Sequence, residues 1–577
     1  MPAKYTEEKN VLMLMSLMKQ HGVRKIVASP GTTNISFVVS LQRDPYFQVF
    51  SSVDERSAAY IACGLAEESG EPVALSCTQA TASRNYFPGL TEAYYRKLPV
   101  LAVTSTQHAV RIGQNIQQAI DRTVQPIDTV KLSVQVPIIQ SAEDATYANV
   151  AINRALLELR RDGGAPVHIN LTTTYTKVYD ASELPKSRSI MRYTSEDELP
   201  QIPSGSRVAI YVGAHSRWSD RLTDAVDSFC ETYGACVLCD QTSNYWGRYR
   251  VNPSLLFSQG NAVASSETID VLIHIGNTSG GAAPRRLKAS WRVNPDGEVR
   301  DTFGCLKNVF DMSEERFFET YASMVDSTTS PAYREECARE ATAIMTKIPE
   351  LPFSNAWMAQ QTLPLFPEGS IIHMGIYNSL RTWSLFEGNR VRGYCNTGGF
   401  GIDGGVSSLL GASLATDAPC FGVFGDLAFF YDMNALGNRH VGNNLRILIV
   451  NNGCGVEFKN HINRAYPLGD EADLYVSARG HYGHQSRKLI KHFAEDLGFE
   501  YRGVETKDEY LVAVDLLVSP EPRDRPVLIE AFVRPEDDTD ALKILYSIEE
   551  TATGNAKAAI KSVIGEKGVR MLKGLVR

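Results

Sequence analysis

The stretch GDLAFFYDMNALGNRHVGNNLRILIVNNGCG, residues 425–455, contains an acid after one apolar run and a pair of asparagines after the next. Asp426 ends the first run, CFGVFGD, and a segment with helical spacing follows it. Asn451 and Asn452 end the second run, LRILIVNN, with Asn452 standing 26 residues after Asp426 (452 − 426). We therefore expect parallel strands of an α/β sheet, which deliver oxygen-bearing side chains to one edge.

These oxygen donors indicate a site for a metal ion and a phosphate. A carboxylate, an amide oxygen and a backbone carbonyl suit Mg²⁺ or Ca²⁺, and the helix N-terminus after Asp426 favours a phosphate group. A second interpretation needs no ligand, because acids are common at strand ends and Asn-Asn-Gly is a good turn. On these residues alone both interpretations stay open.

Short apolar runs alternate with helical patterns along the rest of the chain. The first group of runs is KIVASPG, EPVALSCT, PVLAVTST and APVHINLT, the second RVAIYVGA, ACVLCD and DVLIHIGN, and the third SIIHMGI, CFGVFGD, LRILIVNN and PVLIEAFV. Polar, proline-bearing stretches at residues 181–206 and 347–354 separate the groups. The pattern predicts three consecutive doubly wound parallel-sheet domains of the α/β class, over residues 1–182, 205–345 and 355–577, the last with a C-terminal helical tail.

The composition is that of a globular protein without a nucleic-acid or membrane partner. The formal charge is −8, the pI is near 5.9, and no apolar run is long enough to span a bilayer. Residues 1–20 have the pattern of an amphipathic helix rather than a signal peptide. Of the ten cysteines only Cys236 and Cys239 have CxxC spacing, and the others are scattered singly, which favours reduced thiols. We therefore expect a cytoplasmic location.

The GD and NN pairs of residues 425–452 resemble the diphosphate motif of thiamine-diphosphate (ThDP) enzymes. The segments GDLAFFYDMNAL and VNNGCGVEF are similar to the sequences of one branch, the 2-succinyl-5-enolpyruvyl-6-hydroxy-3-cyclohexene-1-carboxylate synthases, called MenD. Other segments also resemble that branch: IYNSLRTW (376–383), CNTGGFGIDG (395–404), SPGTTN (29–34), residues 51–93 and NIQQAID (115–121). The resemblance implies that the first predicted domain binds the pyrimidine ring of ThDP, that the second is a central α/β domain, and that the third binds the diphosphate.

The resemblance also implies a set of groups that hold Mg²⁺ and ThDP. Asp426 and Asn452 would bind the metal through their side chains, and Cys454 through its backbone carbonyl. Ile402 would support the bent cofactor, although an isoleucine is more simply a core residue. The other cofactor-binding positions that the resemblance implies are Glu55, Ser379, Gly399, Gly425, Leu427 and Val456.

Two residues are the catalytic groups that the resemblance implies. Glu55 would be the glutamate that activates the aminopyrimidine ring, and Gln118 would face the reacting carbonyl. Taken alone, Glu55 could be a first-turn acid that opens a helix, and Gln118 could be a surface amide. The segments around Glu55 and around Asp426 both match the family, although the two residues stand 371 positions apart (426 − 55). This favours the catalytic interpretation.

Several positions that hold arginine in MenD, whose substrates are rich in carboxylates, hold other residues here: Thr33, Gln107, Trp383 and Thr397. A buried carboxylate without a cation costs several kcal/mol, so we expect another donor, such as pyruvate. The remaining substrate candidates are Thr32, Gln79, Gln118, Arg285 and Arg286, of which the two arginines could equally open a solvated helix. Other arginines that could supply a cation are Arg84, Arg111 and Arg381.

The chain lacks the adjacent His-His pair that many ThDP decarboxylases use for proton transfer. This favours carboligation, in which a 2-oxo acid loses CO₂ and its acyl carbanion adds to a second carbonyl compound. The alternatives are a simple 2-oxo acid decarboxylase, an acetolactate-synthase-like enzyme with FAD, and a non-catalytic paralogue. Residues 459–490 diverge from MenD, and His461, His481 and His484 could form a lid there, although a solvated loop is the simpler interpretation.

The resemblance implies an assembly as well as a reaction. In the ThDP superfamily the two ends of the cofactor are bound by different domains, usually from different subunits. We therefore expect a homodimer or homotetramer with the site between subunits. The expected partners are otherwise small molecules, a 2-oxo acid and a carbonyl acceptor.

Overall fold

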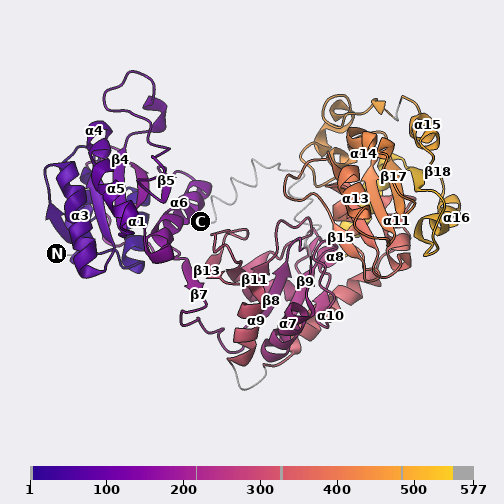
Figure 1. Ribbon diagram of the computed structural model, residues 1–577, viewed down its shortest axis with the longest axis horizontal. Helices are drawn as coiled ribbons and strands as arrows, with labels where there is room; N and C mark the ends of the chain where they lie inside the picture. The colour runs from indigo at the N-terminus through magenta and orange to yellow at the C-terminus, as the bar shows by residue number, and fades with distance from the viewer. Residues whose placement is uncertain (1–3, 216, 261, 325–328, 483–484, 550–577) are drawn as a thin grey trace. The chain divides into compact units, whose positions relative to one another are not determined.

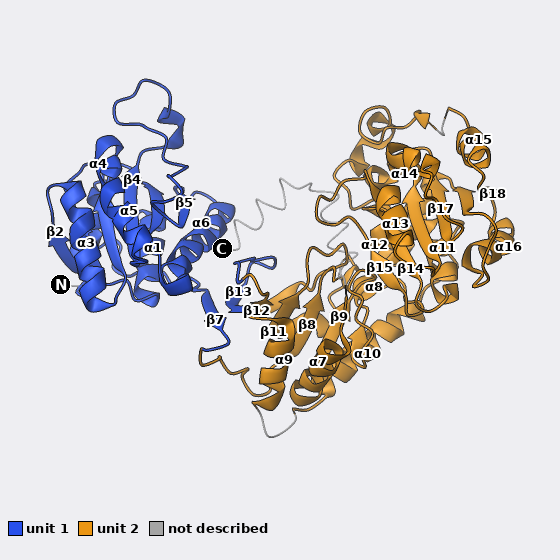
Figure 2. Cartoon of the chain, in the orientation of Figure 1, with its two compact units in different colours: residues 1–196, 297–311 blue, residues 197–296, 312–577 orange. Residues whose placement is uncertain are grey.

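The computed structural model describes residues 4–215, 217–260, 262–324, 329–482 and 485–549 (Figure 1). The chain forms two compact units, one of residues 1–196 with 297–311 and the other of residues 197–296 with 312–577 (Figure 2). The predicted C-terminal helical tail and His484 lie outside the described residues. Among the residues that are described, no helix is long and apolar enough to cross a membrane.

The first unit contains a six-stranded parallel sheet. Its strand order is β2-β1-β3-β4-β6-β5, a doubly wound order in which the first strand lies inside the sheet. The strands are β1 (Lys25–Ala28), β2 (Gln48–Ser51), β3 (Val73–Cys77), β4 (Val100–Thr106), β5 (Leu132–Val136) and β6 (Val167–Thr172). A further parallel pair in this unit is formed by β7 (Met191–Thr194) and β13 (Leu306–Asp311).

Helices cover both faces of this sheet. Ile26, Leu101 and Ile169 pack in one core cluster with α1 (Lys9–Gln20) and α6 (Ala142–Glu158). The alternate strand residues, such as Val27, Leu75 and Ala102, pack in the other cluster with α3 (Glu55–Ser69) and α5 (Phe87–Tyr95). Because successive strand residues point to opposite faces, the continuous apolar runs of the sequence fit a sheet that is buried on both sides. The remaining helices of the sheet are α2 (Ile35–Arg43) and α4 (Ala80–Asn85).

The second unit begins with five parallel strands in the order β10-β9-β8-β11-β12. They are β8 (Val208–Val212), β9 (Cys236–Cys239), β10 (Arg250–Val251), β11 (Thr268–Ile275) and β12 (Arg286–Val293). The interpretation of Arg285 and Arg286 as a helix start is wrong, because Arg286 begins a strand that pairs with β11. The helices of this part are α7 (Asp220–Tyr233), α8 (Ser254–Phe257), α9 (Glu314–Ser323) and α10 (Ala332–Met345).

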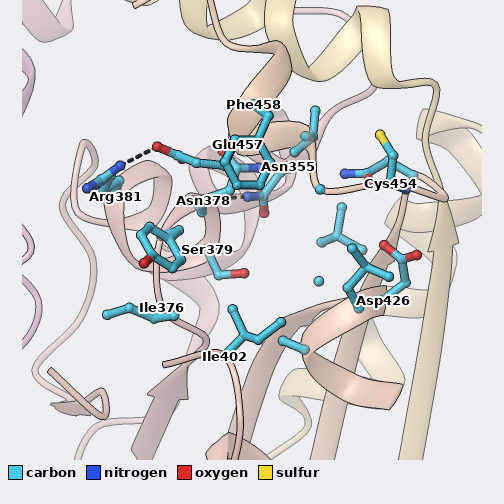
Figure 3. Close-up of a pocket in the computed structure, with 18 of the residues that line it drawn as sticks. Asn355, Ile376, Asn378, Ser379, Arg381, Ile402, Asp426, Cys454, Glu457 and Phe458 are labelled. Carbon is cyan, nitrogen blue, oxygen red and sulfur yellow. Dashed lines mark hydrogen bonds and ion pairs between the residues drawn. The ribbon is translucent and has the colours of Figure 1, made fainter. Parts of the chain in front are cut away.

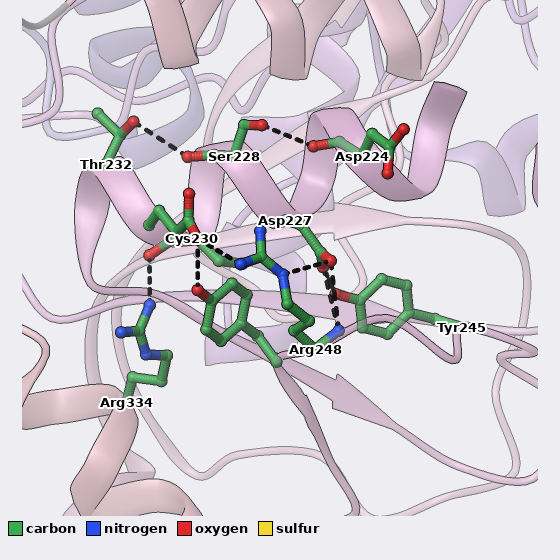
Figure 4. Close-up of polar contacts among 10 residues, drawn as sticks. Asp224, Asp227, Ser228, Cys230, Thr232, Tyr245, Arg248 and Arg334 are labelled. Atoms are coloured by element: carbon green, nitrogen blue, oxygen red, sulfur yellow. Dashed lines mark hydrogen bonds and ion pairs between the residues drawn. The ribbon is translucent and has the colours of Figure 1, made fainter. Parts of the chain in front are cut away.

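A buried carboxylate ties α7 to the loop that follows β9 (Figure 4). Asp227, which is 6% exposed, accepts hydrogen bonds from the Tyr245 hydroxyl and from Arg248, whose Nε lies 3.1 Å from Oδ2. Arg334 of α10 donates from Nη1 to the carbonyl of Cys230 on α7 over 2.9 Å. A buried carboxylate is tolerated where donors satisfy it, so this cluster is a structural anchor of the middle sheet.

The third sheet, also in the second unit, has six parallel strands in the order β15-β14-β16-β17-β19-β18. The strands are β14 (Ile371–Met374), β15 (Arg392–Tyr394), β16 (Cys420–Gly425), β17 (Leu445–Asn451), β18 (Glu500–Val504) and β19 (Val527–Phe532). Its helices are α11 (Asn355–Thr362), α12 (Asn378–Trp383), α13 (Gly405–Ser413), α14 (Asp426–Asp432), α15 (Leu489–Asp496), α16 (Lys507–Val518) and α17 (Pro535–Tyr546).

The α/β class with parallel sheets and flanking helices is confirmed. Each apolar run that the sequence marked as a strand is one in the structure, with bounds shifted by a few residues. The strands that the sequence did not reveal are mostly short edge strands such as β2, β10 and β18, where polar and half-exposed residues hide the apolar signal.

Candidate active site

The two strand ends that carry Asp426 and Asn452 lie next to each other in the third sheet. β16 and β17 pair in parallel, with Gly425 opposite Val450. Asp426 therefore leaves one strand where Asn451 and Asn452 leave its neighbour. Gly453 follows with φ of +71°, a left-handed conformation that glycine adopts without steric cost. This turn brings Cys454 back toward the same edge of the sheet.

Asp426, Asn452 and Cys454 line a cavity of about 700 Å³ (Figure 3). A pocket of this size is ordinary for a cofactor or small-molecule site. Its walls come from the end of β16, the turn after β17, the start of α12, the segment before α13 and a short 3₁₀ helix, Val456–Lys459. Of the predicted cofactor and metal residues, the cavity is lined by Ser379, Ile402, Gly425, Asp426, Leu427, Asn452, Cys454 and Val456.

Asp426 is a buried acid with one unsatisfied oxygen. The residue is 1% exposed, and its Oδ2 has no hydrogen-bond partner among the described residues. Burial raises the pKa of Asp426 to about 7, and backbone hydrogen bonds at Asp426, Asn452 and Leu427 act in the opposite direction. An uncompensated buried carboxylate is costly, and a divalent cation would stabilise its charged form. The residues present thus fit a metal ion at this position.

Asn452 faces the cavity with a defined amide orientation. Its Nδ2 donates to Oδ2 of Asp538 over 2.9 Å, and its Oδ1 accepts from the backbone N–H of Cys454 at 3.4 Å. Asp538 lies in the first turn of α17 and is 2% exposed. The sequence indicated no role for Asp538, because it is one of several acids in PEDDTD and only the fold brings it under Asn452.

Cys454 can offer its main-chain carbonyl oxygen to a metal ion. Burial raises the pKa of its thiol to about 12, so the sulfur stays protonated at neutral pH. Its carbonyl oxygen accepts from the backbone N–H of Val456 at 3.0 Å and keeps a second lone pair for a hard cation. In the described residues no three His, Cys, Asp or Glu side chains gather as a metal cluster, and the donors here are instead one carboxylate, one amide and one carbonyl.

An apolar and aromatic wall lies beside these donors. Ile376 and Ile402 line the cavity together with Tyr377 and Phe400, whose rings meet edge to face with centroids 5.4 Å apart. Tyr377 and Phe400 have φ of +63° and +57°. Such values are rare outside glycine and cluster at functional sites. The sequence contains no signal for this strain, because both residues read as ordinary aromatics.

Charged side chains also line the cavity. Arg381 of α12 forms an ion pair with Glu457 and lies over the Tyr377 ring (Figure 3). Burial raises the pKa of Glu457, and Arg381 acts in the opposite direction. Arg464 is exposed and has no ion pair among the described residues. The sequence analysis named Arg381 as a possible source of a cation. It did not identify Glu457 or Arg464, because no local sequence pattern distinguishes them from other charged residues.

Most of the other predicted residues of this unit lie outside the cavity lining. Trp383 is fully buried and donates from Nε1 to Oδ1 of Asn355 over 2.9 Å. Thr397 is buried, and Gly399 is exposed in the segment before α13. Arg285 pairs with the buried Glu267, Nη2 to Oε1 being 2.6 Å, whereas Arg286 is exposed. None of these five residues lines the cavity described above.

In the first unit, predicted residues gather at the carboxyl edge of the first sheet. Glu55 is half-buried and opens α3 after β2, with Asp54 as the N-cap, so the first-turn position foreseen for it is observed. Thr33, after β1, is buried, and its Oγ1 lies 2.8 Å from Thr78 Oγ1 and donates to the carbonyl of Ser105 over 3.1 Å. Gln79, after β3, is 4% exposed, and its Oε1 lacks a partner among the described residues.

The remaining candidates of this unit are more exposed. Thr32 is exposed beside the buried Thr33. Gln118 lies in the long loop between β4 and β5, with an exposed side chain and φ of +63°. Gln107, in the same loop, contacts Arg111 and Tyr175. The structure thus brings Glu55, Thr33 and Gln79 to one sheet edge and leaves Gln118 on a loop.

The histidines of the divergent stretch show no acid–base arrangement in the described residues. Burial lowers the pKa of His461, whose ring lies 5.8 Å from that of Tyr546. His481 is exposed next to Tyr482.

The chain is similar in sequence to known proteins over most of its length. The family model described as "Thiamine pyrophosphate enzyme, N-terminal TPP binding domain" matches residues 11–125. A 2-succinyl-5-enolpyruvyl-6-hydroxy-3-cyclohexene-1-carboxylate synthase from Bacteroides thetaiotaomicron is 31% identical over 94% of this chain and 99% of the relative. The chain belongs to this synthase family. A synthase of the same name from Phocaeicola vulgatus is 30% identical, over 94% of this chain and 98% of the relative.

A solved structure, the thiamine diphosphate-dependent 4-hydroxybenzoylformate decarboxylase of Rhodococcus jostii, aligns over 91% of this chain and 99% of that chain. It is 18% identical to this chain, with a TM-score of 0.38. Membership of the synthase family confirms the resemblance seen in the motifs and makes the chain a ThDP-dependent enzyme of the carboligase and lyase type.

Proposed function

We propose that this enzyme removes CO₂ from a 2-oxo acid and joins the remaining acyl unit to a second carbonyl compound, with Mg²⁺ and ThDP bound in the cavity of the third sheet. The observation that carries the proposal is the buried oxygen of Asp426 that lacks a hydrogen-bond donor among the described residues, in a cavity that Asn452 and Cys454 also line. Asp426, Asn452 and the carbonyl of Cys454 would hold Mg²⁺, which binds such hard oxygen donors.

Each cofactor-side residue has a task that its position supports. ThDP, when bound, supplies the nucleophilic carbon and the electron sink for loss of CO₂. Ile402 and Leu427 offer apolar surface inside the cavity, and Ser379, Gly425 and Val456 line it beside them. Gly399, in the exposed segment before α13, remains a proposed contact on the resemblance alone.

Glu55 and Gln118 complete the proposal from the other unit. Glu55 would hold a proton at its carboxyl for the aminopyrimidine ring, and Gln118 would orient the reacting carbonyl. We propose residues 1–182, 205–345 and 355–577 as the pyrimidine-binding, central and diphosphate-binding domains. We also propose a homodimer or homotetramer in which Glu55 of one subunit serves the cofactor of another. Sedimentation velocity measures this assembly, and a monomer with full activity would contradict it.

The substrate differs from that of the MenD relatives in this proposal. The hydroxyl of Thr33 is committed to Thr78 and Ser105, and Trp383 is buried against Asn355, so neither position offers a cation. Arg464 is the cavity cation without an acidic partner among the described residues, and Arg381 shares its charge with Glu457. One exposed guanidinium suits a single carboxylate, such as that of pyruvate, better than two substrates rich in carboxylates.

Glu457 favours a second candidate function, simple decarboxylation. It is a mostly buried carboxyl in the cavity wall, and burial raises its pKa. Such a group can deliver a proton, which is the role that the missing His-His pair left open. Without an acceptor, this function would release free aldehyde.

A substrate screen tests both functions. Purified protein with Mg²⁺ and ThDP is given single 2-oxo acids, and CO₂ release is followed with and without pooled aldehydes and keto-sugars. Carboligation predicts CO₂ release that rises with the acceptor and a new carbon–carbon bond detected by mass spectrometry. Aldehyde at the same rate without acceptor would favour simple decarboxylation, and efficient turnover of 2-oxoglutarate with isochorismate would overturn the proposed change of substrate.

A further inference from the structure

A chain of buried hydrogen bonds runs from the core of the second unit to Asn452. Trp383 Nε1 donates to Oδ1 of Asn355 over 2.9 Å, and the backbone N–H of Asn355 donates to Oδ1 of Asp538 over 2.7 Å. Oδ2 of Asp538 accepts from Nδ2 of Asn452 over 2.9 Å. Trp383, Asn355 and Asp538 are each at most 2% exposed. The chain connects α12, α11, α17 and the turn after β17.

Asp538 decides which end of the Asn452 amide points away from it. A carboxylate accepts hydrogen bonds and cannot donate them. One of its oxygens is taken by a backbone N–H, which can only donate, so the carboxylate cannot move to another partner without leaving that N–H buried and unpaired. The other oxygen therefore selects the NH₂ group of Asn452. If the amide were rotated by 180°, its oxygen would face the carboxylate and both would lack a donor.

We infer that Asp538 is a positioning residue that presents the amide oxygen of Asn452 to the divalent cation. The inference rests on the proposed function, because it assigns Asn452 to the metal. Residues of this kind, which orient a ligand through its other atom, change metal affinity about 10- to 100-fold when they are replaced. Asp538 stands 86 positions after Asn452, on α17 after β19, far from the motif that marks the site in the sequence.

The substitution Asp538→Asn keeps the shape of the side chain and reverses one hydrogen bond. The new amide at position 538 can still accept from the N–H of Asn355, but its NH₂ then faces Asn452. Asn452 would rotate to accept that hydrogen bond and would turn its own NH₂ toward the metal. We expect the apparent Kd for Mg²⁺, titrated as MgCl₂ at saturating ThDP and followed by calorimetry, to rise about 10- to 100-fold.

The double substitution Asn452→Asp with Asp538→Asn restores the pattern. The new carboxylate at position 452 accepts from the new amide with one oxygen and offers the other to Mg²⁺, so the Kd should return to within about 3-fold of the unmodified chain. Asn452→Asp alone places two carboxylates face to face and should bind Mg²⁺ more weakly than the double variant. If Asp538→Asn is not recovered folded, the comparison of these two variants tests the inference.

Asp432→Asn is the matched control. Asp432 is 6% exposed, and its two oxygens accept from the N–H and the hydroxyl of Ser407 over 2.6 and 2.7 Å. It lies outside the cavity lining. We expect this variant to lose a similar amount of thermal stability without cofactor and to keep its affinity for Mg²⁺.

The outcomes separate the two proposals. If the unmodified protein binds ThDP no better with MgCl₂ than with EDTA, the proposed function fails. If it binds ThDP with Mg²⁺ and Asp538→Asn leaves the Kd for Mg²⁺ unchanged, the inference about Asp538 is overturned and the proposed function stands. An Asp538→Asn defect that the second substitution does not correct would make Asp538 a structural residue only and would equally overturn the inference.

Discussion

Asp426 and Asn452 leave two paired strands of the third sheet at the strand ends, whereas Gln118 lies in the long loop between β4 and β5 of the first unit. The resemblance to MenD predicted a role for all three residues. The strand-end residues share a cavity with most of their predicted partners. In the first unit Glu55 begins α3, whereas Gln118 is exposed on a loop. Residues that a parallel sheet carries to its edge are positioned by local sequence, and residues on loops depend on what packs against the loop.

Glu55→Gln gives the largest expected effect and tests the first-unit side of this comparison. A glutamine keeps the shape but cannot hold the proton, so turnover should fall about 100-fold or more while ThDP binding changes little. Turnover and calorimetric binding are measured on the same preparation. Glu68→Gln, an exposed position on the same helix, should leave both values intact. Normal turnover in Glu55→Gln would remove Glu55 from its role.

Asp426→Asn tests the third-sheet side. The neutral amide removes the charge of the proposed metal ligand, so the Kd for ThDP at fixed MgCl₂ should rise about 100-fold. Without Mg²⁺ the variant should be no less stable than the unmodified chain, because the buried carboxylate oxygen has no donor to lose. Thermal unfolding with and without MgCl₂ measures this. Tight binding of ThDP by the variant would contradict the ligand assignment.

Arg464→Ala sharpens the question of the substrate. Removing an exposed cation from the cavity wall should raise KM for a 2-oxo acid about 3- to 10-fold and leave kcat nearly unchanged. The effect should shrink as salt is added. Arg525→Ala is the control, since Arg525 is exposed outside the cavity lining. An unchanged KM would direct the search for the carboxylate site to Arg381.

Low pH should weaken the first sheet through His168. The ring lies between Thr104 Oγ1 at 2.7 Å and Ser133 Oγ at 2.8 Å, and burial, with a smaller effect of Arg122, lowers its pKa to about 3. The unfolded chain takes up a proton below its ordinary pKa near 6.5 and the folded chain does not, so stability falls as pH drops below about 6.5. The expected slope from this residue is about 1.4 kcal/mol per pH unit.

Urea unfolding at pH 7 and pH 5 measures that slope, with His168→Gln as the comparison. The glutamine variant should be less stable at pH 7 and should lose less stability on acidification. Equal pH dependence in the two proteins would show that His168 is not the group that titrates.

Trp383→Phe has the smallest expected effect and tests the interior of the third-sheet region. The change removes the donor to Asn355 Oδ1 in a fully buried setting. We expect a loss of about 1 kcal/mol in the free energy of unfolding, with no change in KM for the 2-oxo acid. A large change in KM would place Trp383 in the substrate pocket, as the sequence comparison with MenD suggested.

The strands and the residues at the ends of β16 and β17 could be predicted because their signals are local. An apolar run that is followed by Asp426, or by Asn451 and Asn452, predicts both a strand and the residue at which that strand ends. Asp538, Glu457 and Arg464 could not be predicted, because each is an ordinary charged residue of a helix or loop until another segment is folded against it. Trp383 is the opposite case. Its position in the sequence suggested a substrate contact, whereas in the structure it is a buried hydrogen-bond donor to Asn355.

The sequence by itself determined the α/β class, the order of the apolar runs and the residues that leave β16 and β17, because strand periodicity and strand ends are properties of neighbouring residues. Only the tertiary structure decided which amide atom Asn452 turns to the cavity, which acid lies under it and which arginine of the cavity wall lacks an acidic partner in the described part of the chain. Those features depend on contacts between segments far apart in the chain, such as the hydrogen bond between Asn452 and Asp538, which are 86 positions apart. They also depend on the burial of side chains, which no local sequence pattern predicts.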